Sequence, residues 1–201
     1  MATLQELLNS PNQSVRLKAA LAAGTYPNPD QIEILLSRCA DESDFFVRDT
    51  LSWALMRHDQ KSVVDQLKIE LKSENSQARS QALHTLSKIG DKENYILITR
   101  DLLLDSDDFV ASTAWRSASV LVPDADKQAL VELLISQLGR GDSDTQFGLT
   151  RFLCAIGQPI VAPLTQAAQS LDEAVRTHAE FTLIRFQEME LEKVKRNKRG
   201  R

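Results

Sequence analysis

The chain has 201 residues, of which 42% are hydrophobic, and a formal net charge of −4. This composition is typical of a folded protein with an apolar core, and the sequence has no apolar run of about 18 residues that could cross a membrane. The N-terminal residues lack the pattern of a secretion signal, and Cys39 and Cys154 lie far apart in the chain, so we expect a reduced, cytoplasmic setting.

The chain is predicted to consist of helices in consecutive pairs. The first helix is expected at 3–9, and a second helix ends near Gly24. Pro27 and Pro29 lie in the link to the next pair, since proline cannot continue a helix but fits its first turn. The later helices are expected at 30–40, 44–58, 61–73, 75–89, 92–104, 107–121, 125–139, 142–156, 159–169 and 172–194.

The pattern of residues 44–55 recurs about every 32 residues. With Val47 as the reference position, the equivalent residues are Val15, Val47, Ala78, Val110, Thr145 and Val175. Three places earlier, every copy has a side chain that can accept hydrogen bonds from the first turn of a helix: Asn12, Asp44, Asn75, Asp107, Asp142 and Asp172. We therefore predict a single repeat domain over 1–192, in which each pair packs on its neighbours.

The segments 12–20, 44–48 and 172–179 resemble the second helix of HEAT repeats, including the short bacterial type found in bilin lyases. The resemblance implies an all-α fold, a right-handed α-α superhelix (α-solenoid) of about six HEAT-like hairpins, in a family whose members mostly bind other macromolecules. It also implies that the arginine one place after the reference residue makes polar contacts between repeats. This arginine is present at 16, 48, 79 and 176, but Ala111 and Gln146 replace it in two repeats.

One column of residues is predicted to face away from the buried side of the second helices. At about 100° per residue, the residue six places after the reference residue points outward. That column contains Leu21, Trp53, His84, Arg116, Arg151 and Phe181. In HEAT-like arrays the second helices line the concave surface, and Trp and Arg are enriched where partners bind.

We therefore predict a concave binding site for an acidic or carboxylate-bearing segment of a partner protein. Its residues are Asp49, Trp53, His84, Trp115, Arg116, Phe147 and Arg151. The alternative is that Trp53 and Trp115 pack in the seams between helices, and that Asp49 only pairs with a nearby arginine.

The C-terminal segment 193–201 is strongly basic. It has no acidic residue and six basic ones, Lys193, Lys195, Arg196, Lys198, Arg199 and Arg201. Such a block is typical of a disordered, solvated tail, and basic residues are favoured at the C-terminal end of a helix. The alternatives are a contact with nucleic acid or a membrane surface, or with the acidic surface of the chain itself.

The sequence gives little support for catalysis. His58, His84 and His178 occupy different positions of the repeat, and no pair has the spacing of metal ligands. No serine or cysteine has a nearby histidine that could activate it. We therefore expect a monomeric, non-enzymatic scaffold with no catalytic residues, no metal and no cofactor.

Two functions known among HEAT-like proteins remain as alternatives. Bilin lyases of the short HEAT type attach tetrapyrroles, whose propionates would suit Arg116 and Arg151. Alkylpurine DNA glycosylases built from HEAT-like helices use Trp, Asp and Arg in a groove, and Asp49, Trp53, Trp115 and Arg151 offer these residue types. The acidic excess outside the tail disfavours a DNA-binding protein, because DNA affinity depends on neutralised phosphates.

Overall fold

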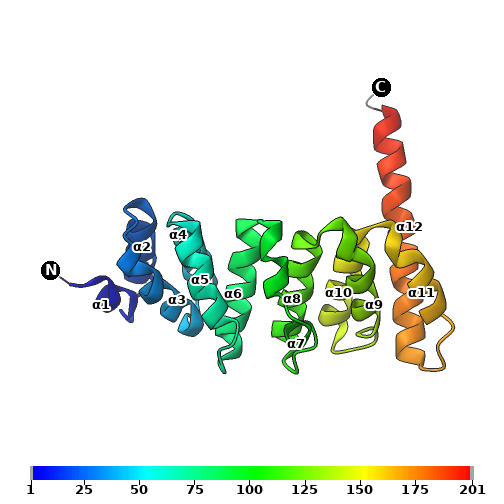
Figure 1. The fold of residues 1–201 in the computed structure, drawn as a ribbon, viewed down its shortest axis with the longest axis horizontal. Helices are drawn as coiled ribbons and strands as arrows, with labels where there is room; N and C mark the ends of the chain where they lie inside the picture. Colours follow the sequence, from blue (N-terminus) through cyan, green and yellow to red (C-terminus); the bar gives the residue numbers. More distant parts are fainter. Residues whose placement is uncertain (1, 200–201) are drawn as a thin grey trace. The chain divides into compact units, whose positions relative to one another are not determined.

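The computed structural model describes residues 2–199, and within this range it contains α-helices, short 3₁₀-helices and no strand. The chain divides into two compact units, Met1–Leu97 and Ile98–Arg201. In each unit, consecutive helices pack as pairs (Figure 1). The prediction of an all-α protein built from helical pairs is confirmed.

The first unit contains three helical pairs. Its elements are α1 (Leu4–Leu8), α2 (Gln13–Thr25), η1 (Pro29–Gln31), α3 (Ile32–Asp41), α4 (Phe45–Met56), α5 (Gln60–Glu70), α6 (Ser76–Ile89) and η2 (Lys92–Leu97). The second helices α2, α4 and α6 each begin after a predicted capping residue, as where Asp44 Oδ1 accepts the Val47 N–H at 3.0 Å. The reference residue Val47 is fully buried, and α4 packs on both α2 and α6.

The second unit also contains three pairs. Its elements are α7 (Arg100–Leu103), α8 (Asp108–Leu121), η3 (Asp124–Asp126), α9 (Lys127–Ile135), α10 (Ser143–Ile156), η4 (Gln158–Ile160), α11 (Val161–Ala167) and α12 (Glu173–Arg199). Asp107, Asp142 and Asp172 accept hydrogen bonds from the first turns of α8, α10 and α12. The second helices pack in the order α8, α10, α12.

The predicted helix at 92–104 is broken in the structure. η2 is followed by the four-residue helix α7, and Thr99 lies between them in an extended conformation. The Thr99 hydroxyl accepts the N–H of Leu102 at 3.4 Å and so begins a new helix. Threonine competes with a continuous helix in this way, and the equivalent residue in the other repeats is leucine.

A set of hydrogen bonds closes the turn between the two helices of a pair. The residue two places before the cap accepts the N–H of the cap through its side chain, and these residues are Ser10, Glu42, Ser73, Asp105 and Ser170. In most pairs the repeat arginine donates to the carbonyl of the same residue, as from Arg48 to Glu42 at 2.8 Å and from Arg79 to Ser73 at 2.8 Å. Arg48 and Arg79 thus bind within their own pair, whereas Arg16 also binds Glu42 of the next pair at 2.7 Å, which is a contact between repeats of the kind that the resemblance implies.

The two repeats that lack this arginine are compensated differently. Where Ala111 replaces it, Arg140 of the next turn donates to the carbonyl of Asp105, the acceptor equivalent to Ser10 and Glu42. Arg140 also pairs with Asp108 at 2.8 Å, and its guanidinium lies 5.7 Å from the centre of the Trp115 ring. In the following repeat, Gln146 donates to the carbonyls of Gly139 and Gly141 at 3.2 Å each.

The basic segment is helical as far as the structure describes it. α12 continues to Arg199, so residues 193–199 differ from the disordered tail that we expected. Lys193 pairs with Glu190 at 2.6 Å and Arg196 with Glu192 at 3.8 Å. Pairs at these spacings stabilise a helix. The predicted contact residue Arg201 lies outside the described residues.

Candidate functional site

Three predicted site residues lie in the first unit, and two of them, Trp53 and Asp49, contact neighbouring helices. Trp53 on α4 is half-buried and covers Gly24 of α2, where an added Cβ would lie 2.3 Å from the indole ring. This placement favours the alternative in which Trp53 packs between helices. Asp49 pairs with Lys88 of α6 at 2.5 Å, rather than with an arginine. His84 is half-buried on α6.

Trp115 in the second unit is a core residue. Its side chain is 0% exposed, and its indole N–H donates to the carbonyl of Leu103 at 2.8 Å. The side chain therefore points from α8 toward α7 rather than to the surface. The prediction of Trp115 as a partner contact is wrong, because a buried ring cannot touch a partner.

Arg116 and Arg151 are exposed, as predicted from their column. They occupy equivalent positions on α8 and α10, which pack directly on each other. Within residues 2–199, neither guanidinium has an ion-pair partner. Two arginines on neighbouring helices are thus available for a ligand that carries negative charge.

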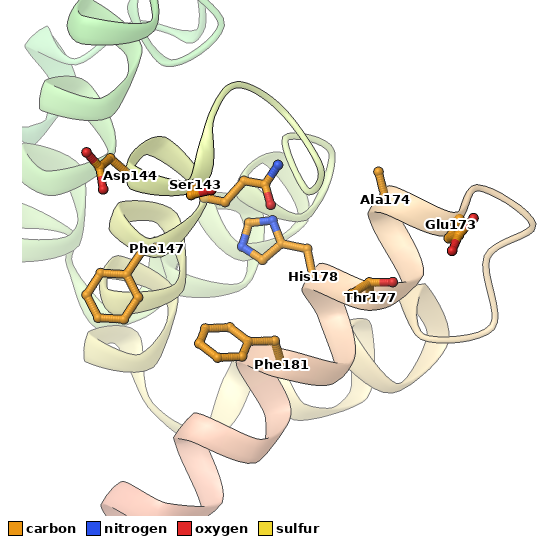
Figure 2. Close-up of a pocket in the computed structure, with 9 residues that line it drawn as sticks. Ser143, Asp144, Phe147, Glu173, Ala174, Thr177, His178 and Phe181 are labelled. Carbon is orange, nitrogen blue, oxygen red and sulfur yellow. The ribbon is translucent and has the colours of Figure 1, made fainter.

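A groove of about 840 Å³ opens between α10 and α12 (Figure 2). Arg151 follows its lining residue Phe147 by one helical turn on α10. The groove is lined by Ser143, Asp144, Gln146, Phe147, Glu173, Ala174, Thr177, His178 and Phe181. The side chains of Phe147 and Phe181 are 45% and 42% exposed. Figure 2 shows the Phe181 ring directed from α12 toward α10, on which Phe147 lies.

His178 forms the floor of the groove and is held by the protein on both ring nitrogens. Nδ1 accepts the N–H of Gly139 at 3.0 Å, so Nε2 carries the proton and donates to Thr150 Oγ1 at 3.1 Å. The Thr150 hydroxyl then donates to Thr182, whose hydroxyl donates to the carbonyl of His178. Burial lowers the pKa of His178 and so favours the neutral ring, and both ring nitrogens are already used in hydrogen bonds within the protein.

The rim of the groove carries two carboxylates, one on each helix. Asp144 lies on α10 and Glu173 on α12, and both are exposed (Figure 2). The neighbouring Asp142 and Asp172 already cap the two helices, so the rim carboxylates are not needed as caps. In the described part of the chain, Asp144 and Glu173 form no ion pair, and no lysine or arginine lines the groove.

The chemistry available elsewhere is limited. Burial raises the pKa of the Cys39 thiol to about 12 and also raises the pKa of Cys154, which disfavours the thiolate that a nucleophile requires. Residues 2–199 hold no group of three His, Cys, Asp or Glu side chains that could bind a metal. In the same range, no helix has the length and apolar character needed to cross a membrane.

Phe147 and the exposed arginines were predicted from the sequence, but the groove was not. Asp144 and Glu173 look like ordinary first-turn acids, which the helix dipole favours. One signal in the sequence could have identified them. Asp142 and Asp172 already cap α10 and α12, so Asp144 and Glu173 are two further acidic residues, not needed as caps, near the aromatic residues.

Part of this chain is similar to a known family. A model described as HEAT repeats matches residues 1–56. In sequence comparison no curated protein matches the chain.

Several solved structures are similar to this chain at low identity. An engineered protein has 22% identity, covers 92% of this chain and 95% of its own, and has a TM-score of 0.48. A second engineered protein has 19% identity, coverage of 94% and 100%, and a TM-score of 0.46. The complex of CpcE and CpcF of phycocyanin lyase from Nostoc sp. PCC7120 has 19% identity, coverage of 93% and 89%, and a TM-score of 0.36. By the family match, residues 1–56 of this chain are similar to HEAT repeats.

Proposed function

We propose that the protein is a non-enzymatic interaction module, and that α8, α10 and α12 of its second unit bind a segment of a partner protein. The observation that carries this proposal is the pair of exposed, unpaired arginines, Arg116 and Arg151, on helices that lead to an open aromatic groove. Arginine and large aromatic side chains supply most of the binding energy in many protein interfaces.

The arginines select for negative charge in the partner. A guanidinium presents a fixed fork of N–H donors that can bind a carboxylate through two parallel hydrogen bonds. Arg116 and Arg151 are not held by an acidic neighbour in the described residues, so a partner carboxylate has no intramolecular competitor. The partner segment is therefore expected to carry an Asp or Glu side chain where it crosses α8 and α10.

The test is an affinity capture from the native cell lysate, read by mass spectrometry. Wild type is compared with Arg116→Ala/Arg151→Ala and with the control Arg57→Ala/Arg100→Ala, which removes two exposed arginines elsewhere. We expect a protein that wild type and the control recover and the first variant loses. Circular dichroism confirms that each variant folds. Recovery of the same proteins by all three chains would show that the arginine pair does not bind a partner.

A further inference from the structure

We propose that the groove between α10 and α12 binds an apolar side chain of the partner that is flanked by lysine or arginine. This inference rests on the proposed function and adds the chemistry of the segment that enters the groove. It assigns a second recognition element beside Arg116 and Arg151, with the opposite charge preference.

Phe147 and Phe181 supply the apolar surface of the groove. Both rings are almost half exposed, one from each helix, and they line the same hollow. Covering apolar surface is favourable in proportion to the area removed from water, so an aliphatic or aromatic side chain between these rings would be stabilised. The floor is fixed, because His178 is hydrogen-bonded to Gly139 and Thr150. A preformed apolar hollow is typical of a binding site.

The negative charge of the groove rim determines which residues of the partner segment can flank its apolar side chain. Asp144 and Glu173 stand on opposite sides of the groove, and neither has a cationic partner in the described residues (Figure 2).

The cations on the surrounding elements are mostly engaged elsewhere. Arg140 pairs with Asp108, Arg176 donates to the carbonyl of Ser170, and Arg185 pairs with Glu188. Arg151 is free but lies one helical turn beyond Phe147 on α10.

A cationic side chain would therefore gain on both sides of the hollow. It can pair with the rim carboxylates, and the faces of Phe147 and Phe181 also attract cations. A carboxylate at the same place would be repelled by Asp144 and Glu173. The partner segment is thus bipolar, with lysine or arginine around the residue in the groove and an acidic residue near Arg116 and Arg151.

Defined peptides test this inference by fluorescence anisotropy. The three probes are fluorescein-labelled amphipathic peptides with one leucine pattern, whose remaining positions are all lysine, all glutamine or all glutamate. On wild type we expect the lysine peptide to bind about tenfold more tightly than the glutamine peptide, with a preference that weakens as salt is added.

Two variants and a control assign the binding to the groove. Asp144→Asn/Glu173→Gln is expected to remove most of the preference for lysine, whereas Phe147→Ala/Phe181→Ala is expected to weaken the lysine and glutamine peptides alike. The control Glu33→Gln/Asp126→Asn removes two exposed carboxylates elsewhere and should leave binding unchanged. An equal loss in the control would show diffuse attraction of a cation to an acidic protein, and the inference would be wrong.

The outcomes also separate this inference from the proposed function. If wild type shows no saturable binding of the lysine peptide, or if the rim variant binds it as wild type does, the inference fails. A partner captured through Arg116 and Arg151 would still support the proposed function in that case. If capture is also independent of those arginines, both proposals fail.

Discussion

At the scale of single residues, Glu42 shows how the turn of a helical pair is stabilised from inside. Its side chain is fully buried, and Arg16 of the preceding pair binds both carboxylate oxygens at 2.7 and 2.9 Å. Arg38 contacts Oε2 at 2.9 Å, and the N–H of Asp44 donates to Oε1 at 2.9 Å. Burial by itself raises the pKa of Glu42, but these hydrogen bonds outweigh it and lower the pKa to about 2.

Replacing Glu42 by glutamine is expected to destabilise the protein by about 3–5 kcal/mol, because it leaves the guanidiniums of Arg16 and Arg38 without their negative partner. Urea unfolding followed by circular dichroism measures this free energy. The matched control is Asp65→Asn, which removes an exposed carboxylate paired with Lys68 and should change the free energy of unfolding far less, because water screens an exposed pair. Equal effects of the two substitutions would show that the buried network contributes no more than a surface pair.

The same pKa gives the direction of the pH dependence. The carboxyl of Glu42 titrates at a lower pH in the folded protein than in the unfolded chain, so the unfolded chain binds the proton first on acidification. The stabilising contribution of Glu42 is therefore complete above the unfolded value of about 4.3 and is lost as pH falls toward 2. The difference in stability between wild type and Glu42→Gln should shrink over that window.

At the scale of helices, two glycines inside the helical pairs have opposite roles. A Cβ added at Gly148 on α10 would lie 3.5 Å from Ser112 Oγ and 3.6 Å from the Phe152 ring, which is ordinary contact. A Cβ at Gly24 on α2 would lie 2.3 Å from the Trp53 ring and 2.9 Å from the Cα of Ala54. The close approach of α2 and α4 therefore requires glycine at 24, whereas α10 does not require it at 148.

We expect Gly148→Ala to stabilise the protein by about 0.5–1 kcal/mol, because alanine loses less backbone entropy in a helix. Gly24→Ala should destabilise it by about 1–3 kcal/mol, since the indole and the facing helix must move apart. Thermal unfolding measures both shifts. A neutral or stabilising Gly24→Ala would contradict the packing described for α2 and α4.

The helices also show which features a single sequence can predict. The caps and reference residues were predictable because their chemistry is local and repeats in every copy, as Asp44 and Val47 illustrate. The placement of Trp115 was not predictable in this way. It is next to the exposed Arg116 in the sequence, but its side chain points toward α7, where the indole N–H donates to the carbonyl of Leu103. The hydrogen bond from Arg140 to the carbonyl of Asp105, in the turn before α8, was not predictable either. It depends on how consecutive pairs stack, which the spacing of residues along the chain does not reveal.

The candidate site also contains residues that could be predicted from the sequence and residues that could not. Arg116 and Arg151 were predictable, because helical periodicity alone places them on the exposed side. Asp144 and Glu173 were not, since their role depends on the hollow between α10 and α12, which no local pattern reveals. Trp53 shows the limit of a prediction from helical periodicity. The spacing places it in a partly exposed column, but its ring packs against Gly24 of the neighbouring helix.

At the scale of the whole molecule, the distribution of charge disfavours binding of nucleic acid along the helices. The chain carries a net charge of −4 although its C-terminal segment is basic, so the rest of the chain has a larger acidic excess. Part of the basic charge is also compensated within α12, where Lys193 pairs with Glu190 and Arg196 with Glu192. Affinity for DNA comes mainly from phosphate neutralisation, so the basic C-terminal segment 193–201 is the part of the sequence best suited to such contacts.

We therefore expect the full chain to show no binding of a short DNA duplex at about 0.15 M salt, and weak binding at about 0.02 M salt because screening is then reduced. A chain truncated after Glu192 should lose the weak binding while circular dichroism and the melting temperature show that its helices remain folded. Fluorescence anisotropy of labelled duplex measures the affinity of both chains across a salt titration. Binding that survives the truncation and resists salt would favour a DNA-directed function on the helical surface, because the acidic units could hold DNA only through specific contacts.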